Sequence, residues 1–195
     1  MPRFLDPKQG ALARRMVVQF LRLGILYAVY AMILVSCETA LLFPASSREV
    51  KFERSEISDW GQSRLFETSS GESGEALFIP TEREGERVPL LVMAHGNGEL
   101  IDDYVGDAMS WSRKGVNVLM IEYPGYGIGT GTPSTAGIRE VTVQAYDWVL
   151  DEQLNHPPSR VVGFGFSLGT GIVCHLAKER RIDALLLAAP FSALH

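Results

Sequence analysis

The sequence predicts an α/β fold with a mostly parallel sheet, and two observations support this prediction. Four short runs are almost continuously apolar, which is typical of strands buried on both faces of a sheet. They are Pro89–Ala94, Val116–Ile121, Arg160–Phe164 and Ala184–Ala188. Helical patterns separate these runs, at Asp102–Arg113, Ser134–Leu154 and Leu168–Arg180. This alternation indicates right-handed crossover connections, with helices covering both faces of the sheet.

The stretch before the first apolar run has a different character. Glu49–Arg54 alternates polar and apolar residues, which predicts a strand with one solvent-exposed face. Ser63–Thr68 and Glu75–Ile79 flank a run of Ser, Gly and Glu residues, which is typical of a β-hairpin. We therefore expect antiparallel strands at the start of the domain, followed by the parallel part of the sheet.

The N-terminal segment, residues 1–43, is expected to attach the chain to a membrane, and residues 44–195 form the globular domain. Basic residues up to Arg22 precede the apolar stretch Leu23–Val35. An uncleaved membrane anchor is one interpretation, since apolar residues continue to Phe43. The other is a lipoprotein signal, because Leu34-Val35-Ser36-Cys37 resembles a bacterial lipobox in which Cys37 is lipidated. Both place the basic end in the cytoplasm and the domain on the other side.

Composition and missing motifs exclude several classes of function. The net charge of the chain is −5, although residues 1–22 carry five basic residues and a single acidic one, Asp6. The rest of the chain is therefore acidic, which argues against nucleic acid as a partner. The four histidines are scattered, and neither an H-E-x-x-H motif nor a cysteine pair indicates a metal site. Three Gly-x-Gly pairs occur, but each lacks the third glycine of the G-x-G-x-x-G motif, which argues against a dinucleotide-binding protein. We expect no metal and no cofactor.

The most informative stretch is Val161–Gly171, where an apolar run ends at Ser167 and a helical pattern begins at Leu168. Gly165, Ser167 and Gly169 form a G-x-S-x-G pattern across that junction. In a strand–turn–helix context this pattern predicts a nucleophile elbow, which exposes the serine hydroxyl above the edge of the sheet. The glycines are needed because a strained turn leaves no room for Cβ atoms on either side of the serine.

Two further loops follow strands that should end at the same edge of the sheet. One is His95-Gly96-Asn97-Gly98-Glu99, and the other runs from Glu122 through Tyr-Pro-Gly-Tyr-Gly to Gly129. Ligands bind beyond the carboxyl ends of the strands in such sheets. Together with the elbow, these motifs resemble the α/β-hydrolase superfamily, in particular the membrane-anchored Bem46-like and serine-aminopeptidase-like serine hydrolases. The resemblance extends from about Phe43 to His195.

The resemblance implies a role for each of these residues. Ser167 would be the nucleophile, and the backbone N–H groups of Leu168 and Asn97 would form the oxyanion hole. His95 and Gly96 would have structural roles in their loop. The implied substrate is a small-molecule, lipid or peptide acyl compound, whose ester, thioester or amide bond is attacked to form an acyl-enzyme without a cofactor.

The acid and base of a catalytic triad are not identified in the sequence. In this fold they follow the serine, and only 28 residues follow Ser167. Asp183 precedes its strand and therefore belongs to the opposite edge, His175 lies more than two helical turns after the serine, and His195 is the final residue. We expect the chain to represent the N-terminal two-thirds of a hydrolase, without the C-terminal strands, and to be weakly active or inactive. The alternatives are a non-catalytic binding protein of the same fold and an acyltransferase.

Overall fold

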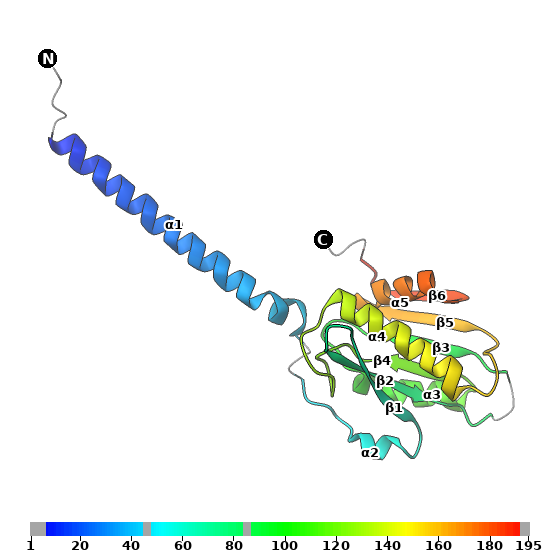
Figure 1. The fold of residues 1–195 in the computed structure, drawn as a ribbon. Helices are drawn as coiled ribbons and strands as arrows, with labels where there is room; N and C mark the ends of the chain where they lie inside the picture. The colour runs from blue at the N-terminus through cyan, green and yellow to red at the C-terminus, as the bar shows by residue number, and fades with distance from the viewer. Residues whose placement is uncertain (1–6, 45–47, 84–86, 192–195) are drawn as a thin grey trace. The chain divides into compact units, whose positions relative to one another are not determined.

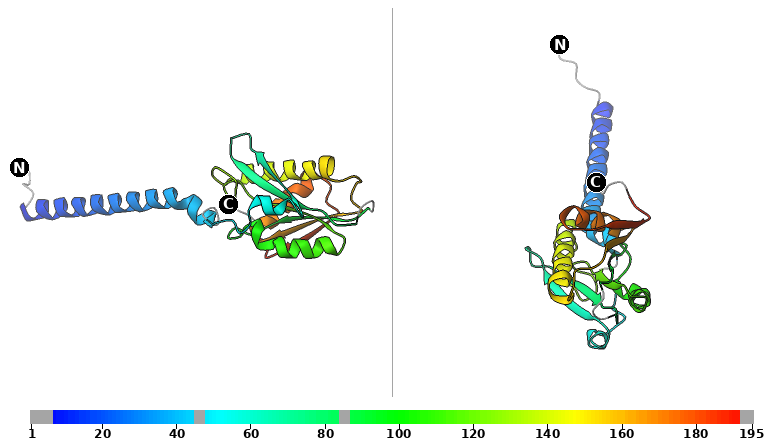
Figure 2. Two further views of the ribbon diagram at one scale, coloured as in Figure 1. Left: turned by 90° about the horizontal axis from the view of Figure 1, so that it is seen from below. Right: turned by 90° about the vertical axis from the view of Figure 1, so that its right-hand side faces the viewer.

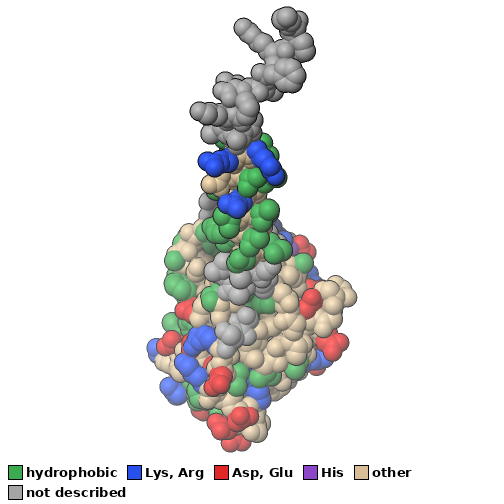
Figure 3. All heavy atoms as spheres, turned by 90° about the vertical axis from the view of Figure 1, so that its left-hand side faces the viewer, with side chains coloured by type: hydrophobic (Ala, Val, Ile, Leu, Met, Phe, Trp, Pro, Cys, Tyr) green, Lys and Arg blue, Asp and Glu red, His purple; other side chains and the backbone are tan. Residues whose placement is uncertain are grey.

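The computed structural model describes residues 7–44, 48–83 and 87–191, and the chain divides into two compact units, Met1–Leu41 and Leu42–His195. The described residues of the first unit all belong to helix α1 (Pro7–Leu42). Within it, Arg14–Leu34 is long and apolar enough to cross a membrane. Its 21 residues correspond to about 31 Å of helix, close to the thickness of a bilayer's hydrocarbon core. Hydrophobic side chains cover this stretch, with basic ones near its N-terminal end (Figure 3).

The second unit is built on one six-stranded sheet with the strand order β1-β2-β4-β3-β5-β6 (Figure 1). β1 pairs antiparallel with β2, and β2 pairs antiparallel with β4, whereas the remaining neighbours are parallel. The strands are β1 (Gln62–Glu67), β2 (Ser73–Ile79), β3 (Leu90–Ala94), β4 (Asn117–Ile121), β5 (Val161–Phe166) and β6 (Ala184–Ala188). The predicted antiparallel hairpin and the predicted parallel strands are confirmed.

Helices cover both faces of this sheet (Figure 2). They are α2 (Arg54–Ile57), the 3₁₀ turn η2 (Ile101–Tyr104), α3 (Val105–Arg113), α4 (Thr135–Trp148), the π-helical turn η3 (Val149–Gln153) and α5 (Leu168–Glu179). In the left view of Figure 2, α3 lies on one face of the sheet and α4 on the other. The start of α4 is fixed by Ser134, whose hydroxyl oxygen accepts a hydrogen bond of 3.0 Å from the Gly137 N–H.

The core consists of two layers because successive residues of a strand face opposite sides. On the α4 side, Phe78, Val92 and Leu119 pack with Val141 and Ala145. On the α3 side, the alternate strand residues pack with that helix; they include Leu77, Ile79, Met93, Val118 and Met120. All these residues are almost fully buried, as expected for strands covered on both faces.

The predicted strand at Glu49–Arg54 is wrong. No strand is present there, and Arg54 instead begins α2. The N–H groups of Lys51 and Phe52 donate to the buried carboxylate of Asp102, at 2.5 and 3.3 Å, rather than to a neighbouring strand. A local alternation of residues cannot reveal that a distant side chain takes the place of a strand partner.

Strand β6 forms one edge of the described sheet, and its leucines are exposed. Leu186 is 56% exposed, and Leu185 and Leu187 are also accessible. An apolar edge strand is a site of self-association. We expect Leu186→Lys to lower the association of the full chain in detergent, measured by analytical ultracentrifugation, whereas Leu65→Lys on β1 should have a smaller effect. Unchanged association of the Leu186 variant would contradict this prediction.

Candidate active site

Ser167 occupies the sharp turn between β5 and α5. Its backbone has φ 48° and ψ −113°, and it is one of two described non-glycine residues with positive φ. Such a conformation costs about 1–3 kcal/mol and persists only where the surrounding structure fixes it. The Ser167 N–H donates to the Ala188 carbonyl at 2.9 Å, and the Thr170 hydroxyl donates to the Ser167 carbonyl at 2.7 Å. The turn is thus held by β6 and by the first turn of α5.

The two glycines of the G-x-S-x-G pattern lie where backbone segments approach closely. A Cβ on Gly165 would lie 2.5 Å from the carbonyl oxygen of Gly169, and a Cβ on Gly169 would collide with the carbonyl of Ala94. Neither neighbour is the end of a flexible side chain, so relief would require backbone movement. These two positions therefore allow α5 to start directly against the ends of β5 and β3.

The loop after β3, His95–Glu99, lies beside this turn. β3 and β5 are adjacent parallel strands with Ala94 opposite Gly165, so their loops emerge next to each other. A Cβ on Gly96 would come within 2.9 Å of the ring of Phe166, the residue immediately before Ser167. The Leu168 N–H begins α5 and is one of the four N–H groups that have no acceptor within the helix. The chain thus gathers Asn97, Ser167 and Leu168, the predicted oxyanion and nucleophile residues, at one edge.

Asn97 is held by the loop after β4. The Tyr126 hydroxyl lies 3.0 Å from the Asn97 carbonyl oxygen and 2.9 Å from its side-chain Oδ1. Tyr126 itself is fully buried, and burial raises its pKa, so this hydroxyl remains a donor at neutral pH. Tyr126 is a contributor that the sequence did not single out; the sequence predicted only that its loop follows a strand ending at the same edge of the sheet.

A buried ion pair joins the loops after β3 and β4. His95 Nε2 lies 2.7 Å from Glu122 Oε1, and His95 Nδ1 lies 2.8 Å from the Gly96 carbonyl oxygen. Because both ring nitrogens face acceptors, the doubly protonated imidazolium fits the site best. Burial lowers the pKa of His95, but the Glu122 carboxylate, the Gly96 carbonyl and Glu99 together raise it by more, and the net shift is upward. The sequence analysis did not identify Glu122 as the partner of His95. The signal was available, because an acidic residue at the end of β4 and a histidine at the end of the neighbouring β3 lie at the same edge of the sheet.

This pair gives a prediction for pH dependence. A histidine whose pKa is raised by folding contributes stability that is complete below about pH 6.5 and is lost as the pH rises through the folded-state pKa. We expect the melting temperature of the full chain to fall as the pH rises above about 6.5 and through the folded-state pKa of His95. Glu122→Gln should lower the melting temperature and flatten its dependence on pH. An equally steep pH dependence in the Glu122 variant would show that another group is responsible.

None of the described histidines lies where it could act as a base for Ser167. His95 is engaged as described, and His175 lies eight residues further along α5, about 12 Å by helix rise. Burial and the charge of Arg139 lower the pKa of His175. Asp183 lies at the opposite edge, where its carboxylate accepts from the Val161 N–H at 2.8 Å. His195 lies outside the described residues, and so does the side chain of Cys37, although the Cys37 backbone belongs to α1.

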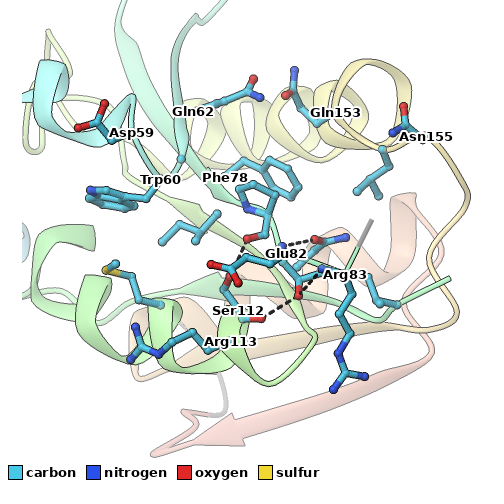
Figure 4. Close-up of a pocket in the computed structure, with 18 of the residues that line it drawn as sticks. Asp59, Trp60, Gln62, Phe78, Glu82, Arg83, Ser112, Arg113, Gln153 and Asn155 are labelled. Atoms are coloured by element: carbon cyan, nitrogen blue, oxygen red, sulfur yellow. Dashed lines mark hydrogen bonds between the residues drawn. The ribbon is translucent and has the colours of Figure 1, made fainter. Parts of the chain in front are cut away.

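The cavity drawn in Figure 4 is separate from this site. It has a volume of about 570 Å³, and its lining includes Trp60, Asn117 and Gln153. Asn117 begins β4 and Gln153 precedes β5, so the cavity lies at the amino ends of the parallel strands. Among the described residues, no group of three or more His, Cys, Asp or Glu side chains could hold a metal ion.

Comparisons with known proteins agree with this fold. The family model described as serine aminopeptidase, S33, matches residues 85–195. A crystal structure of an α/β-hydrolase from Vibrio vulnificus superposes with a TM-score of 0.62 at 16% identity, over 80% of this chain and 58% of that one. An esterase from Pyrococcus furiosus superposes with a TM-score of 0.54 at 17% identity, over 72% and 54% of the two chains.

Two curated relatives are similar over part of this chain. An uncharacterized protein of Mycobacterium tuberculosis is 33% identical over 132 residues, which are 66% of this chain and 41% of that protein. Lysophosphatidylserine lipase ABHD12 of Rattus norvegicus is 32% identical over 111 residues, 53% of this chain and 27% of the lipase. The matched stretch thus spans less than half of each relative. The family model matches more than half of this chain, and the chain therefore belongs to the serine aminopeptidase, S33, family of α/β-hydrolases.

Proposed function

We propose that this protein is a serine hydrolase in which Ser167 attacks the carbonyl carbon of an ester. The observation that supports this most is the strained turn at Ser167, with its positive φ, directly beside the His95–Glu99 loop. Strain of this kind is retained where a side chain must be presented to a substrate. The N–H groups of Asn97 and Leu168 then stabilise the oxyanion, and loss of one such donor typically costs about 3 kcal/mol of transition-state stabilisation.

The chemistry proceeds through an acyl-enzyme. The Ser167 Oγ bonds to the acyl carbon, its proton passes to a base, and the alcohol leaves with a proton. Water then attacks the acyl-enzyme and releases the carboxylic acid. Since none of the described histidines lies at Ser167, we propose that the triad base comes from outside the described residues.

We propose an amphipathic acyl ester as the substrate. The relative named as a lysophosphatidylserine lipase and the apolar helix α1 favour a lipid ester over a peptide. The experiment compares the release of fatty acid from monoacyl lipid esters with the cleavage of aminoacyl naphthylamides, using the chain extended at its C-terminus to supply a base, in detergent. Ester cleavage that is lost in Ser167→Ala but kept in Ser134→Ala is the expected result. Preferential amide cleavage, or ester cleavage by the Ser167 variant, would refute the proposal.

Two other functions of the same fold remain as outcomes of this experiment. Acyl transfer to added glycerol in preference to water would identify an acyltransferase that uses the same serine. Saturable lipid binding without any turnover, in a chain extended to supply a base, would identify a binding protein.

We also propose that α1 anchors the protein in a membrane, with its basic end in the cytoplasm and the domain on the opposite side. The lipoprotein hypothesis differs in its dependence on Cys37. Cys37→Ser should leave the protein in the membrane fraction after carbonate washing if α1 is the anchor. Release of that variant would instead favour lipidation.

A further inference from the structure

The segment that connects α1 to the domain touches the candidate site. Its described residues are Phe43, Pro44 and Arg48–Arg54, and we refer to them as the connecting segment. The Arg48 Nη1 atom donates to the Gly98 carbonyl at 2.9 Å and to Asp103 Oδ2 at 2.7 Å, while Nη2 donates to Asp103 Oδ1 at 3.1 Å. One guanidinium therefore joins the turn that contains Asn97 to the 3₁₀ turn η2.

Three successive carbonyl groups in this turn have side-chain partners. The Gly96 carbonyl contacts the His95 ring, the Asn97 carbonyl accepts from Tyr126, and the Gly98 carbonyl accepts from Arg48. Each carbonyl shares a rigid peptide plane with the N–H of the next residue. The contacts from His95 and Tyr126 therefore fix the planes on both sides of Asn97, and the contact from Arg48 fixes the following plane, between Gly98 and Glu99. The Asn97 N–H lies in the first of these planes. Of the three partners, Arg48 alone comes from outside the loops at the sheet edge.

The Asp103 carboxylate extends this restraint to the end of the turn. Its Oδ2 atom accepts from the Leu100 N–H at 3.0 Å, in addition to the bond from Arg48. The hydrogen bond from Arg48 is the main reason why the pKa of Asp103 lies well below its usual range, so the pair remains ionised throughout the neutral range. Arg48 and Asp103 thus hold the turn at both Gly98 and Leu100.

The connecting segment is itself fixed to the domain. Asp102, which is almost fully buried, accepts from the N–H groups of Lys51 and Phe52. The ring of Phe43 contacts Tyr126 edge-on, with the ring centroids 6.4 Å apart, and Tyr126 holds Asn97. The segment therefore reaches the Asn97 turn directly through Arg48 and indirectly through Phe43.

We infer that Arg48 is a positioning residue, which restrains the turn that carries the Asn97 N–H and thereby sets the reactivity of Ser167. This inference rests on the proposed function of Ser167. The Arg48 and Asp103 side chains are 37% and 22% exposed, so their pair adds little to global stability. Loss of Arg48 should consequently affect reactivity more than folding, and this difference separates positioning from a purely structural role.

The test measures the rate of covalent labelling of Ser167 by a fluorophosphonate, using the full chain in detergent and intact-mass detection. Arg48→Ala should lower the rate about tenfold, because small displacements of catalytic groups have effects of this order or larger. The melting temperature should change by less than about 2 °C. Arg64→Ala is the matched control, since Arg64 also makes an arginine–carboxylate pair, with Glu152, which is more exposed and lies on the far edge of the sheet. A labelling rate for Arg48→Ala equal to that of the wild type would overturn the inference.

A second variant separates the contact with Gly98 from the ion pair. Arg48→Lys keeps a cation beside Asp103 and leaves the bond from the Leu100 N–H to Asp103 in place, but it lacks the forked guanidinium that joins Asp103 to the Gly98 carbonyl. The melting temperature should match that of the wild type, while labelling stays about tenfold slow. Full recovery of the labelling rate would overturn the inference, because the ion pair alone would then be sufficient.

Amide hydrogen exchange makes the outcome independent of the proposed function. The Gly96 and Leu100 N–H groups donate to the carboxylates of Glu99 and Asp103 and report directly on the order of this turn. Arg48→Ala should speed the exchange of residues 96–100 by at least about tenfold, whereas Arg64→Ala should not. If Ser167 is never labelled, even in a chain extended to supply a base, the proposed function fails but this measurement still decides the role of Arg48. Unchanged exchange would overturn the inference.

Discussion

Supplying a histidine and a carboxylate to Ser167 is expected to raise ester hydrolysis about 10⁴-fold over that of the 195-residue chain. The physical reason is that a serine hydroxyl is a weak nucleophile until a neighbouring base accepts its proton. Of the described histidines, His95 is committed to Glu122, His156 lines the cavity at the amino ends of the parallel strands, and His175 lies more than two turns along α5. The proposed oxyanion donors, the N–H groups of Asn97 and Leu168, would then support only a residual rate.

The measurement compares single-turnover hydrolysis of a p-nitrophenyl ester by two proteins. One is the 195-residue chain, and the other is that chain continued at its C-terminus with the C-terminal region of the Mycobacterium tuberculosis relative. The extended protein with Ser167→Ala is the control for hydrolysis by other groups. Comparable turnover by the two unsubstituted proteins would contradict the prediction.

Gly169→Ala should destabilise the domain by about 3 kcal/mol or more, which corresponds to a fall in melting temperature of about 10 °C. The added methyl group would meet the backbone carbonyl of Ala94, the last residue of β3. Neither β3 nor the start of α5 can move without disturbing the sheet, because β3 is paired on both sides, with β4 and β5. The cost is therefore steric and cannot be relieved by a change of rotamer.

Gly106→Ala is the matched control for this substitution. Gly106 is an exposed residue of α3, and a Cβ there would meet no atom within 4 Å. Alanine has the higher helix propensity, so this variant should gain up to about 1 kcal/mol. Thermal unfolding of both variants, followed by circular dichroism in detergent, tests the prediction. Equal melting temperatures would mean that the junction between β5 and α5 is looser than the structure indicates.

Much of the fold could be predicted from sequence because its signals are local. The continuous apolar runs identified the parallel strands, since only strands covered on both faces need apolar residues at successive positions. The G-x-S-x-G pattern predicted the turn at Ser167 because the steric requirement falls on residues close in sequence. The same reasoning failed at Glu49–Arg54, where Asp102, about 50 residues away, determines the conformation.

The supporting residues of the candidate site were harder to predict for the same reason. Arg48 contacts Gly98 and Asp103 across 50 and 55 residues, and no local pattern identifies such a pair. Glu122 could have been recognised, because the ends of β3 and β4 meet in a parallel sheet. The contact between Phe43 and Tyr126 depends on the path of the connecting segment, which the sequence does not specify.

The most direct test of the account is to map the adduct formed by a fluorophosphonate on the full chain. After prolonged incubation and proteolysis, mass spectrometry should find the phosphonyl group on the peptide that contains Ser167. The adduct should be absent from Ser167→Ala and retained in Ser134→Ala. An adduct on another residue of the wild-type chain, or an unmodified Ser167 in a chain extended to supply a base, would contradict the assignment of Ser167 as the nucleophile.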